Sequence, residues 1–401
     1  MTEPKEVTKV STLGEICRVL NKSYGDRSCI QGTDAIDDPR RLPTGIFPFD
    51  YATGGGFPVY QASIIKGAEG GGKTSLIMSA MAKVPMLCWR CFKPLTKCEC
   101  SLPPLKMKAA WCDVEGTFNE FWAESIGCNP NDYYLAASES GNEYGDVANK
   151  ILSMDDCSLL VVDSVAALFP SELMEASMSD KNVGLQAKLV TNFVTKINSR
   201  LTTEYKRGHP CLVIVTNQLR ANIGGFSFRG SMPTPTTPGG HALRHFSGIT
   251  INISKKSLQD KEKEKYYDKE HNLFLAQRHS FYIEKYKSLK LSEGGEFIRI
   301  TSDIPERSLF RGDVTDHKMV VSELLAQGIM VKGTSKYTMG SKSGAQKDFV
   351  DTWKKDKNLY FEVQTDLLAH VVEKILKRDT KKKEKEKEKC LPKPVVSAAK
   401  K

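Results

Sequence analysis

The chain has 401 residues, of which 40% are hydrophobic and 26% charged, and its formal net charge is +10 at pH 7. This composition predicts a globular protein with one large core and one or two small modules, and no apolar run approaches the ~20 residues that a membrane span needs. The first residues contain no apolar leader, so we expect a cytoplasmic protein, and the positive charge favours a polyanionic partner.

The first predicted element is an amphipathic helix near the N-terminus. Apolar residues in 13–20 recur at helical spacing, and a loop rich in Asp, Arg and Pro follows at 34–43. We therefore treat residues 1–42 as an N-terminal segment that is distinct from the main core.

A Gly-rich loop at 67–74 ends in Lys73 and Thr74 and fits G-x-x-x-x-G-K-[ST] at every fixed position. A β-rich run precedes it and a helical pattern follows, which is the context that a phosphate-binding loop needs. Backbone N–H groups would face nucleotide phosphates, Lys73 would bridge the β- and γ-phosphates, and Thr74 would bind Mg²⁺. The alternative is a Gly-rich turn before a core helix. The predicted nucleotide-binding residues here are Gly67, Ala68, Glu69, Gly70, Gly71, Gly72, Lys73, Thr74 and Ser75.

A cysteine-rich segment at 88–100 follows this unit. It contains four of the eleven cysteines, as C-x2-C and C-x-C separated by six residues. Thiolates at this spacing can surround a tetrahedral Zn²⁺, and four of them leave no open position, so the predicted zinc site is structural. The alternatives are surface thiols or a redox pair. The predicted ligands are Cys88, Cys91, Cys98 and Cys100.

Two further predictions concern the function of this cysteine-rich segment and the state of the other cysteines. Trp89 and Phe92 alternate with basic residues, so we expect the segment to contact DNA or a partner protein. The seven remaining cysteines are expected to be ordinary buried thiols rather than a disulfide framework.

Short, β-branched apolar runs recur at 108–113, 158–163, 211–216 and 248–253. Such runs are typical of strands that are buried on both faces. We therefore predict an α/β fold with a mainly parallel sheet covered by helices, over residues 43–301.

Three polar residues follow these strands. Asp163 ends the run 159–163, at the edge of an open α/β sheet where ligands lie, and is predicted to support the metal. Glu115 is the leading candidate for activating the attacking water, and a surface carboxylate is the alternative. Gln218 is predicted to sense the γ-phosphate through its amide.

The C-terminal part of the chain changes character. Residues 255–278 are charged and are predicted to be a surface insertion, and residues 302–376 form a smaller Lys- and Gly-rich module. The tail 377–401 begins with a basic stretch, in which residues 377–389 hold eight Lys or Arg and four Asp or Glu. It is either a solvated helix or a disordered tail, and it either contacts an anionic partner or only solubilises the chain.

Taken in order, these motifs resemble the RecA recombinases over roughly residues 13–371. The insertions are similar to those of phage-encoded relatives of the UvsX type. The resemblance implies a RecA-like P-loop NTPase core with a small N-terminal segment for oligomerisation and a small α/β C-terminal domain. The motifs that carry it are 67–74, 111–115, 159–168, 184–188, 216–220 and 238–243.

The resemblance also implies roles for single residues. Glu115 would be the catalytic carboxylate, and Gln218 would couple the γ-phosphate to the DNA loop that follows it. Trp122 would stack on adenine, with Asn119 near the polar edge of the base. Lys285 and Lys287 match a basic pair that reaches the ATP of the neighbouring subunit, although from the residues alone they would be a solvated face.

Two segments, 175–184 and 220–239, match the DNA loops of the family, and the alternative is a pair of plain surface loops. Basic side chains there would neutralise phosphates, and apolar ones would wedge between bases. The implied DNA-binding residues are Val183, Lys188, Arg220, Ile223 and Arg229.

The resulting interpretation is an ATP- and Mg²⁺-dependent recombinase. It would form a homo-oligomeric helical filament on single-stranded DNA and pair that strand with homologous double-stranded DNA. The expected further partners are a single-strand-binding protein and a loader, and no membrane. Two alternatives remain open: a RecA-fold hexameric helicase that forms rings, and a mediator that binds ATP and DNA without pairing strands.

Overall fold

The computed structural model describes residues 12–24, 28–29, 40–138, 140–171, 183–218, 240–334 and 336–390. The chain divides into two compact units, Met1–Met319 and Val320–Lys401. Among the helices in these described ranges, none has both the length and the apolar character that a bilayer crossing requires.

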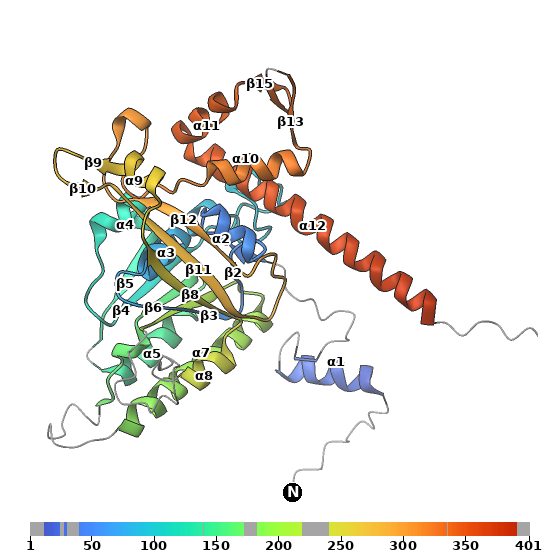
Figure 1. Cartoon of the computed structure of the whole chain (residues 1–401). Coiled ribbons are helices and arrows are strands. Elements are labelled where there is room, and N and C mark those ends of the chain that lie inside the picture. Colours follow the sequence, from blue (N-terminus) through green and yellow to red (C-terminus); the bar gives the residue numbers. More distant parts are fainter. Residues whose placement is uncertain are drawn as a thin grey trace, which may run out of the picture. The chain divides into compact units, whose positions relative to one another are not determined.

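An eight-stranded sheet forms the centre of the first unit (Figure 1), with the strand order β12-β11-β8-β3-β7-β6-β4-β5. The strands from β8 to β5 are parallel, and β11 and β12 extend that edge antiparallel. Their bounds are β3 Ala62–Gly67, β4 Lys108–Asp113, β5 Tyr133–Ala136, β6 Cys157–Asp163, β7 Leu212–Gln218, β8 Ile249–Lys256, β11 Ala276–Tyr286 and β12 Gly294–Ile300. The predicted parallel, buried sheet is confirmed.

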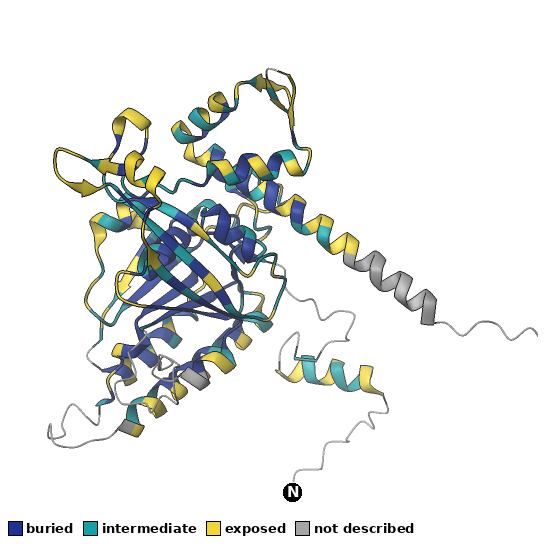
Figure 2. Ribbon diagram, in the orientation of Figure 1, coloured by how far each residue is buried: buried dark blue, intermediate teal, exposed yellow. Residues whose placement is uncertain are grey.

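The central strands β3, β6 and β7 are buried along nearly their whole length, as expected for parallel strands covered on both faces, and Figure 2 shows them as dark central arrows. One apolar core joins the strands to α5, α7 and α8. The helices of this unit are α1 Leu13–Tyr24, α2 Phe47–Ala52, α3 Lys73–Met81, α4 Glu120–Ile126, α5 Gly141–Ile151, α7 Val183–Arg207, α8 Gly240–Phe246 and α9 Asp260–Tyr266. Two short pairings complete it: β1 Arg41–Leu42 with β2 Phe57–Pro58, and β9 Tyr267–Asp268 with β10 Leu273–Phe274.

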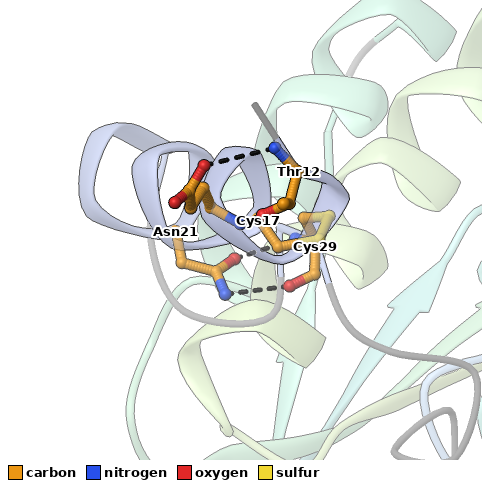
Figure 3. Close-up of a disulfide and its surroundings, with 5 residues drawn as sticks. Thr12, Cys17, Asn21 and Cys29 are labelled. Atoms are coloured by element: carbon orange, nitrogen blue, oxygen red, sulfur yellow. Dashed lines mark hydrogen bonds between the residues drawn. A yellow bond between two sulfur atoms is a disulfide. The ribbon is translucent and has the colours of Figure 1, made fainter. Parts of the chain in front are cut away.

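The predicted N-terminal helix is present as α1, and none of its residues is buried. Cys17 of this helix is disulfide-bonded to Cys29 (Figure 3). The Asn21 side chain donates to the Cys29 carbonyl and accepts from the Cys29 N–H, both at 2.8 Å. The expectation of thiols alone was therefore wrong for this pair, whose separation of 12 residues matches no recognisable pattern.

The second unit holds a three-stranded antiparallel sheet and helices. Trp353 is its buried centre and stacks on Tyr360 with ring centroids 5.5 Å apart. The basic stretch 377–389 continues α12, so the helical alternative holds for it. The elements are α10 His317–Ala326, whose first three residues belong to the first unit, β13 Met330–Lys332, β14 Tyr337–Met339, β15 Lys342–Gly344, α11 Gln346–Lys355 and α12 Lys357–Cys390.

Candidate functional site: a phosphate loop at the carboxyl edge of the sheet

The Gly-rich loop joins β3 to α3, as predicted. Gly72 adopts a left-handed φ of 101°, and a Cβ there would lie 2.6 Å from the ring of His279. At Gly67 a Cβ would lie 2.2 Å from the carbonyl oxygen of Ile253. Larger residues would therefore push the loop away from β8 and β11, which explains the glycines at these two positions.

Lys73 lies inside this loop. Its Nζ donates to the carbonyl oxygens of Gly67 at 3.0 Å and Ala68 at 2.9 Å. Burial lowers the pKa of Lys73, and the carboxylates of Asp163 and Glu115 oppose that shift. The ammonium group is thus held by two main-chain oxygens and feels the charge of nearby carboxylates, at the place where phosphates would bind.

Thr74 and Asp163, the two predicted magnesium residues, are in contact. Thr74 Oγ1 donates to Asp163 Oδ2 at 3.1 Å, and Thr216 Oγ1 donates to the other carboxylate oxygen. Burial raises the pKa of Asp163, while these two hydrogen bonds lower it. A hydroxyl and a carboxylate at one point are oxygen ligands suited to Mg²⁺, so the residues present fit that ion.

Glu115 and Gln218 also meet, although 103 residues separate them. Gln218 Nε2 donates to Glu115 Oε1 at 2.9 Å, and Ser164 Oγ donates to the same oxygen. Glu115 follows the end of β4, Ser164 the end of β6, and Gln218 ends β7. Carboxyl ends of parallel strands share one edge of a sheet, so the predicted pair is brought together there.

Trp122 borders the same site from α4, and its Nε1 donates to Ser75 Oγ at 2.9 Å. Asn119 is the N-cap of α4: its Oδ1 accepts from the Trp122 N–H at 2.8 Å. Because that oxygen is occupied by the cap, the predicted contact of Asn119 with a base would use its amide Nδ2.

A cavity of about 300 Å³ lies beside the loop and contains residues that the sequence did not single out. They come from β8, β11, β12 and the turn after it. Two of them, Lys255 and Gln277, belong to the segment predicted as a surface insertion. That prediction was wrong at both ends, because the ends are sheet strands; the surface excursion is limited to α9, β9 and β10. The cavity residues missed are Lys255, Gln277, His279, Arg299 and Thr301.

Arg299 holds α3 against β12. Its Nη2 donates to Ser79 Oγ at 2.7 Å and to the Ser75 carbonyl at 3.4 Å, and its Nη1 donates to the Gly312 carbonyl at 2.8 Å. Burial lowers the pKa of Arg299 to about 10, so it stays charged at neutral pH. It is a fixed positive charge in the wall of the cavity.

His279 fixes one peptide of the phosphate loop. Its Nδ1 lies 2.9 Å from the Gly71 carbonyl oxygen, and since that oxygen can only accept, Nδ1 carries the proton. In a trans peptide the next N–H points the opposite way, so this bond also fixes the direction of the Gly72 N–H. Burial lowers the pKa of His279 to about 4, and Arg299 and Lys255 add to that shift.

We expect the nucleotide-free protein to lose stability between pH 6.5 and pH 4 because of His279. In this window the unfolded chain binds a proton that the folded chain excludes, so stability falls as pH falls, by up to about 1.4 kcal/mol per pH unit. Thermal midpoints at pH 7 and pH 5 test this for the wild type and His279→Gln. The variant should show the smaller acid-induced loss, and the exposed-hairpin control His271→Gln should keep the wild-type loss. Equal losses in all three proteins would contradict the assignment.

Lys285 and Lys287 lie at the opposite end of the sheet from the phosphate loop. The strand register places Lys285 level with Ile64 of β3, three positions before Gly67. Both ammonium groups donate to main-chain oxygens at the C-terminal end of α8, where the helix dipole favours cations. The pair therefore lies away from the phosphate loop of its own chain.

The predicted DNA loops fall largely outside the described residues. Arg220, Ile223 and Arg229 are among the residues not described. Lys188 is exposed on α7, five residues after Val183, where that helix begins.

The four predicted zinc ligands come together. Their sulfur atoms all lie within 4.8 Å of one another, with Cys88 to Cys100 at 3.9 Å and Cys91 to Cys98 at 3.8 Å. Burial opposes ionisation of Cys88, but N–H groups of the adjacent backbone lower its pKa to about 6. The cluster could hold a metal ion.

Trp89, which lies between basic residues in the cysteine-rich segment, is fully buried. Its Nε1 donates to the Val84 carbonyl at 2.9 Å, and its ring packs edge-on against Phe92. Trp89 is therefore not available for a contact with DNA or a partner, and the contact expected of the segment as a whole stays a prediction.

Comparison with known proteins gives one family. The model of the RecA N-terminal domain matches residues 98–276, a range that includes Glu115, Asp163 and Gln218. Among curated relatives, Protein RecA of Mesoplasma florum is 30% identical over 257 residues, 64% of this chain and 69% of the relative. Protein RecA of Gloeobacter violaceus is 27% identical over 262 residues, 65% of this chain and 64% of the relative. Protein RecA of Xanthomonas campestris is 32% identical over 238 residues, 59% of this chain and 62% of the relative. The matched region of this chain thus spans slightly less than two thirds of the length of the last two relatives.

Proposed function

The chain belongs to the RecA family of recombinases, and from this premise we propose that it is a DNA-dependent ATPase that forms helical filaments on single-stranded DNA and exchanges strands with a homologous duplex. The observation that carries the proposal is the hydrogen bond between Gln218 Nε2 and Glu115 Oε1. Gln218 stands directly before the protein segment 220–239, which is predicted to contact DNA. If that segment became ordered on DNA, Gln218 would pass the change on to the carboxylate that would activate water.

The chemistry follows from the residues around the loop. Bound ATP would lie with its phosphates on the loop amides and Lys73, and Mg²⁺ would be held by Thr74 and Asp163, where it would neutralise phosphate charge. Glu115 would orient the attacking water and accept its proton, since its Oε1 is fixed by two donors. Trp122 would border the base.

We place the ATP between adjoining subunits. Lys285 and Lys287 lie away from the phosphate loop of their own chain, and a second subunit stacked on that face could receive them at its own nucleotide. The unburied α1 gives further support, since its predicted role is to pack on an adjacent subunit.

Replacing both Lys285 and Lys287 with Ala is expected to abolish cooperativity in ATP hydrolysis on single-stranded DNA, because the site between subunits would lose two cations. The measurement is the Hill coefficient for ATP. Lys290→Ala is a matched control, because Lys290 follows the same strand but pairs with Glu293 at 2.7 Å. Unchanged cooperativity in the double variant would place ATP away from the interface.

Electron microscopy with single-stranded DNA and a slowly hydrolysed ATP analogue tests the proposed assembly. Open helical filaments support it, and closed six-membered rings would favour a helicase instead. Joint-molecule formation between a single strand and a homologous supercoiled duplex tests pairing. ATP hydrolysis without joint molecules would favour a mediator.

The proposal extends to the cofactors and surroundings. We propose zinc as the metal of the cysteine cluster, on grounds independent of the nucleotide chemistry, and the cytoplasm as the place of action. The likeness to phage recombinases of the UvsX type stays a prediction. The same holds for a single-strand-binding protein and a loader as partners.

A further inference from the structure

We infer that Cys88, Cys91, Cys98 and Cys100 bind one structural Zn²⁺ ion, which fastens the connection between α3 and β4. This inference goes beyond the proposed recombinase activity, because it rests on sulfur geometry and not on nucleotide or DNA. The site lies between the helix that begins with Lys73 and the strand that leads to Glu115.

The sulfur spacing fits a single tetrahedral ion. Zinc–thiolate bonds are about 2.3 Å long, so the edges of a regular ZnS4 tetrahedron are about 3.8 Å. The pairs Cys88–Cys100 and Cys91–Cys98 lie at 3.9 and 3.8 Å. A disulfide would require about 2.05 Å, so the sulfur atoms of neither pair are bonded to each other, and all four remain available to a metal ion.

The backbone brings the first two ligands together in a tight turn. The Phe92 N–H donates to the Cys88 carbonyl at 2.7 Å, the Cys88 N–H donates to the Lys93 carbonyl at 2.9 Å, and Phe92 takes a left-handed φ of 57°. A bulky residue with positive φ is uncommon and needs a compensating interaction. A metal held by the cysteines on either side of the turn would supply it.

Charge supports the same ion. Between Cys88 and Cys100 the chain carries three basic residues and one acidic residue, a net charge of +2. Zn²⁺ with four thiolates carries −2, so the segment balances the filled site. Four protein ligands leave no position for water or substrate, and the ion would therefore be structural and not catalytic.

The position of the cluster indicates what the ion would hold. Trp89, next to Cys88, is anchored in the core: its N–H donates to the Leu105 carbonyl at 2.9 Å and its Nε1 to the Val84 carbonyl. Val84 follows α3 and Leu105 precedes β4. Closing the intervening loop with a metal would restrict the unfolded chain and stabilise the two elements that carry the ATPase residues.

The first experiment measures metal in the full-length protein, purified without chelator, by elemental analysis. We expect one zinc per chain. Exchange with Co²⁺ should give the intense visible bands of a tetrahedral tetrathiolate site. Stoichiometric iron, or a chain that takes up neither zinc nor cobalt, would overturn the inference. These readouts do not depend on ATP or DNA, so they are separate from the recombinase proposal.

The second experiment uses Cys91→Ser with Cys98→Ser, and Cys128→Ser as the control, because Cys128 is buried outside the cluster. The double variant should lose the zinc and the control should keep it. Amide hydrogen exchange should rise in α3 and β4 of the double variant and remain unchanged in the second compact unit. Faster exchange confined to residues 87–107 would overturn the fastening role. If the double variant fails to fold, the metal content and cobalt spectrum of the wild type decide.

Discussion

Glu115→Gln is expected to lower ATP turnover by about 10²–10⁴-fold while ATP and DNA binding persist, because the amide keeps the shape of the carboxylate but cannot accept a proton from water. The substituted side chain still offers an oxygen to the donors Gln218 and Ser164, so the surrounding hydrogen bonds are kept. The measurement is steady-state phosphate release on single-stranded DNA, with filter binding of the nucleotide and the strand.

Glu120→Gln is the matched control for this variant, because Glu120 is an exposed carboxylate in the first turn of α4, outside the hydrogen-bonded pair. It should hydrolyse ATP at the wild-type rate. If Glu115→Gln did so as well, the carboxylate would have no part in activating water and the network with Gln218 would have to be explained as structure alone.

Lys73→Ala is also expected to reduce hydrolysis strongly, by about 10²–10³-fold, because it removes the cation that would face the transferring phosphate. In contrast to Glu115→Gln, it should also weaken nucleotide binding and assembly, since the same charge attracts ATP in the ground state. The measurement pairs phosphate release with the ATP concentration needed for filament formation.

Lys73→Arg and Lys196→Ala give this experiment its controls. Arginine keeps the charge but its planar group does not fit between the carbonyls of Gly67 and Ala68, so most activity should still be lost. Lys196 is exposed and pairs with Asp146 far from the loop, so its loss should have little effect. A Lys73→Ala protein that binds ATP and assembles normally would show that the lysine acts only in the chemical step.

Much of the ATPase site could be predicted because each of its parts has a local signal. The phosphate loop is a continuous motif, and Glu115, Asp163 and Gln218 follow apolar runs that read as parallel strands. Once the strands are parallel, their carboxyl ends share an edge, and the observed contacts of Glu115 with Gln218 and of Thr74 with Asp163 follow.

The rest of the cavity could not be predicted, because it depends on pairings between distant segments. His279 and Arg299 reach the loop only because β11 and β12 add to the sheet antiparallel beside β8, and nothing in their neighbours in sequence indicates a ligand. Two further residues of the cavity, Lys255 and Gln277, fall in the segment that was predicted to be a charged surface insertion. Trp89 shows the opposite case. An aromatic residue among basic residues is typical of a nucleic-acid contact, but the indole of Trp89 is packed in the core.

The placement of Lys285 and Lys287 at one end of the sheet and the phosphate loop at the other makes each subunit a directional building block. Under the proposed arrangement, copies stack head to tail, and such an interface does not close on itself unless its rotation happens to form a ring. One terminus of every stack then displays an uncovered nucleotide while the other displays an unused lysine pair. Subunits would be added and lost at different rates at the two termini, so ATP hydrolysis would shorten the filament from one end.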